Sequence, residues 1–184
     1  MKLLQGVSKS KKICIVVFIL LVVWIFIIIH FSLQPPDISH NQSLTVIKIL
    51  KKINSFFDIT HTSIYTKIAN FLKGKWFFGL YKSTNMVVRK SAHFGIYFLL
   101  GIIATIFGYM YSRKKLIGLF LGIGLSMTVA VLDEYNQGFV ERTSSLDDVI
   151  IDGVGATIGT LLVIFLLLLF KFFKWLRERF FPVP

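Results

Sequence analysis

Long runs of apolar residues dominate the chain and are separated by shorter polar or basic stretches. Four runs are uncharged or nearly so, at residues 13–33, 91–112, 116–132 and 149–170, and only Asp152 interrupts the last of them. Each run can cross a hydrocarbon layer of about 30 Å as an α-helix, which rises about 1.5 Å per residue and satisfies its own backbone hydrogen bonds in lipid. The pattern therefore predicts an all-α membrane protein with four transmembrane helices, in a single domain over residues 1–184.

Residues 34–90 form a long segment between the first two predicted spans. It opens with Pro35 and Pro36, which end the first helix. Farther on, apolar residues recur at helical spacing (Val46, Ile47, Leu50, Ile53, Phe56 and Phe57) and lysines lie opposite them (Lys48, Lys51 and Lys52). This pattern is typical of an amphipathic helix at the membrane surface. We expect an outer interfacial segment, joined there by residues 64–72 and by the aromatic group Trp76, Phe77, Phe78 and Tyr81. A partly ordered linker with solvated lysines is the alternative.

Basic residues are distributed unevenly between the two sides of this arrangement. The chain has 21 basic and 9 acidic residues, a net charge of +12. Residues 1–12, 113–115 and 171–184 hold 11 of the basic residues but only one acid, Glu178. Because an excess of Lys and Arg marks the cytoplasmic side, we expect both termini inside and an uncleaved first span. The positive charge is then an orientation feature, and nucleic acid is not an expected partner.

Small or polar residues recur every four positions along three of the spans. The stripes are His93, Tyr97, Gly101 and Thr105 in the second span, Gly118, Gly122, Ser126, Ala130 and Glu134 in the third, and Asp148, Asp152, Ala156 and Thr160 in the fourth, with Gly155 and Gly159 beside them. Small residues at this spacing allow helices to approach closely in lipid. We therefore expect the three stripes to face one another and the bulkier first span to pack peripherally.

Polar residues converge on the outer end of the predicted bundle. Ionisable groups at membrane depth are costly, so they mark a functional site by default. The candidate ligand-binding residues are His93, Glu134, Gln137, Arg142, Asp148 and Asp152. A structural interpretation is also open. Ser144 and Ser145 each precede an acid by three residues, as in capping boxes that open a helix. Asp133 and Glu134 can simply end the third helix at the water interface.

Three motifs surround these candidates. They are Arg89-Lys90-x-x-His93-Phe94-x-x-Tyr97, Asp133-Glu134-x-x-Gln137-x-Phe139-x-x-Arg142 and Ser145-x-x-Asp148-Val149, and Gly155, Gly159 and Phe31-Ser32-x-Gln34-Pro35 extend the pattern. Over roughly residues 24–165 the sequence resembles the VanZ-like family. It departs at Ile96, where an acid often precedes the tyrosine, at Val140-Glu141, where Pro-Gly is common, and at Asp152, where Asn is frequent. The resemblance implies a four-helix domain in a bacterial cell membrane and a link to low-level glycopeptide resistance, notably against teicoplanin.

Three kinds of function fit these residues. The first is a non-enzymatic envelope protein that binds the headgroup of an outer-leaflet lipid or cell-wall precursor, with Arg142, Arg89 and Lys90 meeting phosphate. The second is an enzyme in which His93 and one carboxylate exchange protons with such a lipid, although Ile96 in place of an acid weakens it. The third is a small transporter. No cofactor motif and no metal-ligand pattern is visible, so neither group is expected, and an oligomer is compatible with all three functions.

Overall fold

The computed structural model describes residues 9–57, 63, 66–67, 70, 84–142 and 144–180. In this part of the chain five helices follow one another: α1 (Lys9–Ser32), α2 (Pro36–Phe57), α4 (Thr84–Ser112), α5 (Lys115–Phe139) and α6 (Leu146–Phe180). All except α2 are long and apolar enough to cross a membrane. The predicted class, an all-α protein with four candidate spans, is confirmed.

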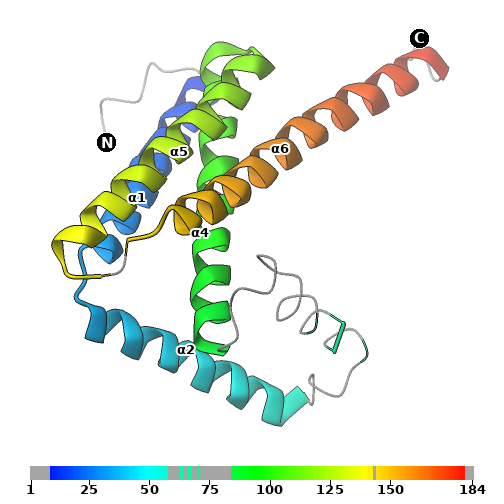
Figure 1. Cartoon of the computed structure of the whole chain (residues 1–184). Coiled ribbons are helices and arrows are strands. Elements are labelled where there is room, and N and C mark those ends of the chain that lie inside the picture. Colours follow the sequence, from blue (N-terminus) through cyan, green and yellow to red (C-terminus); the bar gives the residue numbers. More distant parts are fainter. Residues whose placement is uncertain are drawn as a thin grey trace.

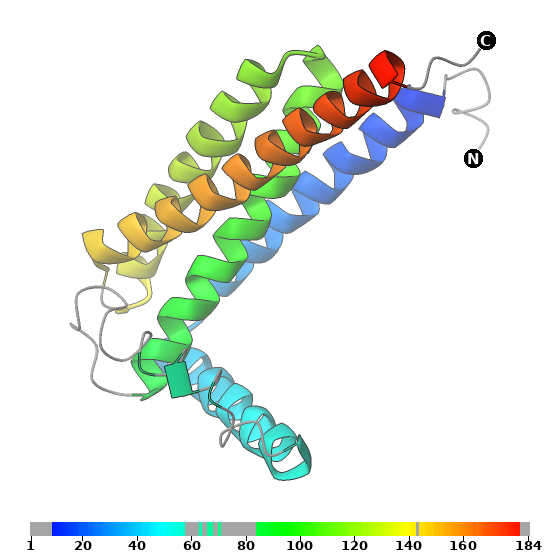
Figure 2. The ribbon, with the colours of Figure 1, turned by 90° about the vertical axis from the view of Figure 1, so that its right-hand side faces the viewer.

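The four long helices run between two distinct ends of the molecule. Figures 1 and 2 place the start of α1, the α4–α5 turn and the end of α6 at one end. The corner between α1 and α2, the start of α4 and the α5–α6 connection lie at the opposite end, which we call the site end. α2 leads away from the bundle there. An even number of crossings thus returns the chain to the side from which it began.

The three small-residue stripes face one another, as predicted. Their residues are buried along α4, α5 and α6, apart from His93 at the site end, which is half-buried. A Cβ atom at Gly101 would overlap the backbone carbonyl of Ala156, and one at Gly159 would overlap the carbonyl of Phe98. The backbones of α4 and α6 are therefore in direct contact, which only small residues permit.

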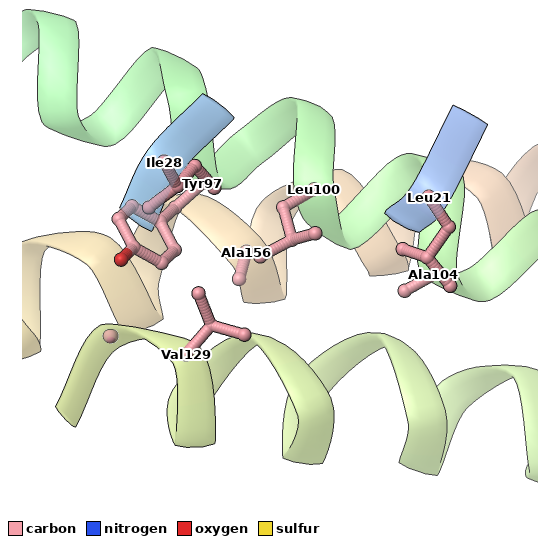
Figure 3. Packing of buried hydrophobic residues seen from close by; sticks show 8 residues of the cluster. Leu21, Ile28, Tyr97, Leu100, Ala104, Val129 and Ala156 are labelled. Carbon is pink, nitrogen blue, oxygen red and sulfur yellow. The ribbon is translucent and has the colours of Figure 1, made fainter. Parts of the chain in front are cut away.

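Apolar side chains fill the space beside these contacts. Figure 3 shows Leu100 of α4, Val129 of α5 and Ala156 of α6 pointing toward one another, with Ile28 of α1 close to Tyr97. All five residues are at most 4% exposed. The apolar core therefore includes all four long helices, and it reaches Tyr97, whose hydroxyl belongs to the polar site.

α1 packs at the periphery, as its bulky sequence predicts. Only 11% of its most apolar window is buried, against 33% in each of α4, α5 and α6. Leu21 and Ile28 join the core, and the indole Nε1 of Trp24 donates a hydrogen bond to the carbonyl of Ile96 at 3.1 Å. α1 thus contacts the other helices along one narrow face only, and a cavity remains between it and α4.

The connection between the first two spans forms the predicted helix α2. Pro36 occupies its first position, where the missing N–H costs nothing because that group has no partner inside a helix. Apolar side chains on α2, including Leu44, Val46 and Ile49, are exposed, whereas Ser43 is buried. The second predicted apolar stretch, 64–72, lies outside the described residues except at 66, 67 and 70, and the aromatic group at 76–81 lies wholly outside them.

All four long helices extend beyond their predicted spans. α1 begins at Lys9 rather than at residue 13, and α4 begins at Thr84 rather than at residue 91, so Arg89 and Lys90 belong to α4 and not to the outer segment.

Asp133, Glu134 and Gln137 lie beyond the predicted span 116–132, but α5 includes all three and continues to Phe139, and α6 begins at Leu146. The reason is that the three side chains lie on the buried face of α5, so their polarity does not end the helix. α6 likewise continues past the predicted end of the span, through the basic and aromatic tail, to Phe180.

Candidate functional site

The last turns of α5 present three polar side chains on one face. Asp133, Glu134 and Gln137 are at most 4% exposed. Spacings of three and four residues bring them together on a helix. The Nε2 group of Gln137 donates to Asp133 Oδ1 at 3.1 Å and to Glu134 Oε1 at 3.2 Å. The amide therefore sits between two carboxylates and fixes the orientation of both.

Asp133 ties this face of α5 to two neighbouring helices. The hydroxyl of Tyr97 on α4 donates to Asp133 Oδ2 at 3.0 Å. The hydroxyl of Ser32, the last residue of α1, donates to the backbone carbonyl of Asp133 at 2.9 Å. Hydrogen bonds to a buried carboxylate compensate for the loss of water around its charge. Asp133 is consequently held by donors on both of its carboxylate oxygens.

Asp152 lies behind this group, in the second turn of α6. Its side chain is 0% exposed, and the Nδ1 atom of His93 lies 3.4 Å from both of its carboxylate oxygens. His93 lies in the third turn of α4 and is half-buried. Among the described residues, Asp152 Oδ1 has no hydrogen-bond partner. A fully buried carboxylate of this kind calls for a compensating cation or proton.

Glu134 on α5 accepts a hydrogen bond from the backbone just before α6. Its Oε2 atom accepts the backbone N–H of Ser145 at 2.8 Å. The hydroxyl of Ser145 in turn accepts the backbone N–H of Asp147 at 3.2 Å. The expected capping role of Ser145 is therefore confirmed, and since the helix begins at Leu146 the cap is Ser145 rather than Ser144.

Asp148 does not complete the capping box that its spacing from Ser145 suggests. In a capping box Asp148 would accept the backbone N–H of Ser145, but that group already donates to Glu134. The carboxylate of Asp148 instead pairs with the ammonium group of Lys90 on α4, and both side chains are 13% exposed. This ion pair joins α4 to the start of α6 at the site end.

Arg142 lies in the short α5–α6 connection, directly after Glu141, whose backbone is left-handed (φ 57°). Its Nη1 atom makes long contacts to the carbonyls of Phe31 at 3.4 Å and Ser32 at 3.5 Å, at the end of α1. The Nε atom is buried without a hydrogen-bond partner among the described residues.

Burial also changes the pKa of this side chain. It lowers the pKa of Arg142, and the like charge of Arg89 lowers it further, while Asp133 and Glu134 raise it. A guanidinium nevertheless stays protonated in proteins. The influence of Arg89 on Arg142 means that two guanidinium groups share this region, which favours an anion between or beside them.

A cavity of about 810 Å³ adjoins this polar cluster. It lies between α1, α2 and α4 and reaches the end of α5. Its apolar wall consists of Trp24, Ile27, Ile28, Phe31, Ile38, Val46, Val88, Ala92 and Ile96. Its ionisable and amide lining consists of Arg89, His93, Tyr97, Asp133, Gln137 and Arg142, with further polar residues from α2. Binding sites for amphiphiles combine such apolar walls with a few convergent polar groups.

The six candidate residues fall into two layers. His93, Gln137 and Arg142 line the cavity. Glu134 and Asp152 lie behind it and contact Gln137 and His93, respectively. The remaining candidate, Asp148, is also outside the cavity and pairs with Lys90, as described above.

Asp133 and Tyr97 were not among the candidates, although both line the cavity and hydrogen-bond to each other. Tyr97 follows His93 by four residues in the same stripe, so that spacing could have identified it. Asp133 precedes the candidate Gln137 by four residues, so the same spacing could have identified it, although its position next to Glu134 also fits a helix end.

A comparison with protein families finds one match that spans most of the chain. The family described as VanZ/LLP1 matches residues 17–170, which include all of α4 and α5, most of α1 and α6, and every residue of the site. No curated protein and no solved structure is similar enough to the chain to count as a match.

Proposed function

The chain belongs to the VanZ/LLP1 family, and from that premise we propose that it is a cell-envelope membrane protein that binds the headgroup of an outer-leaflet lipid or lipid-linked cell-wall precursor. The observation that carries this proposal is the cavity itself, which joins an apolar wall to two guanidinium groups. An amphiphile needs both features, because its chains favour apolar surface while its phosphate favours arginine.

The arginine geometry suits a phosphate more than a simple counter-ion. Arg142 lines the cavity, its contacts to the end of α1 are long, and its buried Nε still lacks an acceptor among the described residues. Arg89 lines the same cavity from α4 and is exposed. Guanidinium groups bind phosphate through paired N–H donors, which gives both strength and orientation. Gln137 and Asp133 then stand near enough to contact the hydroxyl or amide groups of a larger headgroup.

α2 supports a location at a membrane surface. It carries exposed apolar residues together with Lys48, Lys51 and Lys52, and it also contributes Ile38 and Val46 to the cavity. Exposed apolar area next to lysines is typical of helices that lie in the headgroup layer of anionic membranes. In a bacterial cell membrane with both termini inside, the site end would face the outer leaflet, where cell-wall precursors are used.

A lipid-binding experiment tests this proposal directly. Purified protein in mild detergent is titrated with a polyprenyl phosphate or phosphatidylglycerol, and complexes are counted by native mass spectrometry. Diacylglycerol, which has the chains but no phosphate, is the matched ligand control. We expect binding of the phosphate lipids only. Arg142→Lys should weaken it at least about tenfold, because hydrogen bonds to charged groups are worth about 1.5–3 kcal/mol and a lysine cannot reproduce the paired donors.

Arg113→Lys provides the matched protein control. It makes the same chemical change in the exposed α4–α5 turn, at the end opposite the site. Equal affinity of the wild-type protein, Arg113→Lys and Arg142→Lys for phosphate lipids would refute the proposed site. The same variants address teicoplanin resistance: in a sensitive bacterial host that the wild type protects, Arg142→Lys should lose protection at equal membrane abundance and Arg113→Lys should keep it.

One observation favours an enzyme as the second candidate function. His93 lines the cavity and its Nδ1 lies 3.4 Å from Asp152, an arrangement that suits a general base oriented by a carboxylate. An enzyme of this kind would act on the phosphate or glycan of the bound lipid. Release of inorganic phosphate or free sugar that disappears in His93→Gln, with lipid binding retained, would support this candidate over simple binding.

A transporter is less well supported by the arrangement of charges. The charged residues that are buried among the described residues are Asp133, Glu134, Asp148 and Asp152, and all of them lie near the end of α5 or the start of α6. Farther along the core, the buried polar groups are hydroxyls such as Thr105 and Thr160, whose Oγ1 atoms are 3.1 Å apart and hydrogen-bonded to each other. The described core beyond the site therefore offers no buried charged group that could guide a charged substrate across the bundle.

A further inference from the structure

We propose that His93, Asp133 and Asp152 form a binding site for one divalent metal ion. One ligand atom from each residue lies within 4.8 Å of the others. Zn²⁺ holds its nitrogen and oxygen ligands at about 2.0–2.2 Å, which places neighbouring ligands roughly 3–4 Å apart. A shift of less than about 1 Å in these side chains would therefore bring them to the spacing that an ion requires.

The burial of the two carboxylates points to a cation at this place. Asp133 is 4% exposed and Asp152 is 0% exposed. The Nδ1 atom of His93 approaches Asp152 no closer than 3.4 Å, which is longer than an ordinary charge-assisted hydrogen bond. Asp152 Oδ1 additionally lacks a hydrogen-bond partner among the described residues. Unpartnered buried carboxylate oxygens are rare because they lose hydration without compensation, and a metal ion supplies that compensation.

The surroundings of Asp133 resemble the outer support of a metal site. Tyr97 donates to its Oδ2 and Gln137 to its Oδ1. Each carboxylate oxygen keeps a second lone pair, so these bonds orient the group without using up its capacity as a ligand. Carboxylates that bind metals are usually held in this way, and removing such a partner typically weakens metal binding about 10–100-fold.

The three ligands come from three packed helices, α4, α5 and α6, which gives the site a rigid frame. One imidazole and two carboxylates suit Zn²⁺ or Mn²⁺ better than the softer metals that prefer thiolates. Three protein ligands leave at least one coordination position open, as in catalytic zinc sites. His93 and Asp133 line the cavity, so the open position would face it.

Sequence patterns could not have revealed this site. His93 and Asp152 are separated by 59 residues, and Asp133 lies between them on another helix. Metal sites that are recognised from sequence have ligands a few residues apart. Here the three residues meet only because α4, α5 and α6 pack through their small-residue stripes.

Metal titration of the lipid-free protein tests the site without relying on the proposed lipid function. Protein purified in mild detergent is stripped with a chelator and titrated with Zn²⁺ and with Mn²⁺ by calorimetry. We expect one ion per chain for at least one of the two metals. Asp152→Asn and His93→Gln should each weaken binding more than about tenfold, and Tyr97→Phe by about tenfold through its effect on Asp133.

Asp147→Asn is the matched control, because it makes the same change on α6 at an exposed acid. It should leave the affinity for the ion unchanged. Co²⁺ added to the stripped protein provides an independent measurement: its visible spectrum should show a nitrogen ligand that disappears in His93→Gln. Tyr97→Phe keeps the buried ring, so it provides a result even if the ligand variants fold poorly.

Three outcomes would overturn the metal site. One is the absence of a stoichiometric ion in the wild-type protein. Another is equal affinity in the wild type, Tyr97→Phe and Asp152→Asn. The third is a loss in Asp147→Asn as large as that in Asp152→Asn, which would mean that surface acids bind the ion. In each case the pair of His93 and Asp152 would be explained by a shared proton instead.

Discussion

Asp133 connects three helices through its side chain and its backbone. Its carbonyl accepts the hydroxyl of Ser32 on α1, and its carboxylate accepts donors from Tyr97 and Gln137. Loss of the carboxylate would therefore remove two hydrogen bonds in the core and leave the Tyr97 hydroxyl, on a residue 1% exposed, without its acceptor. A residue with this many roles is difficult to assign to either stability or function alone.

Glu141 has a left-handed backbone conformation, which residues other than glycine rarely adopt. It follows the end of α5 with φ 57°, and Arg142 N–H bonds back to the carbonyl of Gln137 at 3.1 Å. A side chain in this left-handed region costs about 1–2 kcal/mol, whereas glycine adopts it freely. We expect Glu141→Gly to raise the stability by up to about 1 kcal/mol, after allowance for the greater freedom of glycine in the unfolded chain.

Thermal unfolding in mild detergent measures this effect. Glu141→Ala is the control, since it removes the same exposed charge but keeps a Cβ atom in the left-handed conformation. Only the glycine variant should unfold at a higher temperature. If the alanine variant gains as much, the charge of Glu141 and not its backbone is responsible.

For single residues, the sequence predicts where the polar side chains lie but not which of them pair. Helical spacing placed His93, Glu134 and Asp152 at one end of the bundle, because spacing and apolar length are local properties. The pairing of Lys90 with Asp148, and of His93 with Asp152, depends on how far α4 and α6 are rotated and shifted against each other. That geometry depends on how the side chains of whole helices pack together, so the local spacing of residues could not predict it.

At the scale of elements, α4 and α6 are held together by backbone contact. Gly155 lies against the carbonyl of Phe94 and Gly159 against that of Phe98, one turn farther along both helices. Gly122 of α5 lies against the hydroxyls of Thr105 and Thr160. The stripes that the sequence predicts therefore determine the packing. The lengths of α5 and α6 were less predictable, because buried polar residues extend α5 and a basic tail extends α6.

Leucine at Gly122 or Gly159 should separate these helices. A bulky side chain would meet the groups just described, and overpacking of this kind costs about 1–3 kcal/mol. Gly124 is the matched control, since it lies on the same helix as Gly122 and a Cβ atom added there would meet nothing within 4 Å. We expect Gly124→Leu to retain the folded yield in mild detergent and the other two variants to lose it. Equal yields would contradict the helix arrangement.

At the scale of the whole molecule, the two ends have opposite character. The site end gathers the buried acids, while the other end carries the basic turn Arg113, Lys114 and Lys115 and the basic last turns of α6. The side chain of Arg113 also contacts the hydroxyl of Ser10, so the turn is fastened to the start of α1. This asymmetry, rather than the total charge, is what orients a multi-pass chain in a membrane.

The orientation itself is a prediction that reporter fusions can check. A fluorescent protein joined after Lys115 should be cytoplasmic and emit light, and alkaline phosphatase inserted near Glu141 should be exported and active. The expectation follows from the basic residues at the end of the molecule where α1 begins and α6 ends. Exchanging the two reporters should abolish both activities. An active phosphatase after Lys115 would mean that the chain has the opposite orientation and that the site end faces the cytoplasm.

The position of Trp24 gives this molecule an optical probe of its own cavity. Its indole lines the apolar wall and is fixed by its hydrogen bond to the carbonyl of Ile96. Indole emission shifts with the polarity of its surroundings, so replacement of water in the cavity by an acyl chain would move it to shorter wavelength. Trp175 lies near the far end of α6 and would not share that response, and replacing Trp76, which lies outside the described residues, by Phe leaves Trp24 as the responding indole. The bundle can thus report occupancy through its native fluorescence, without an attached label.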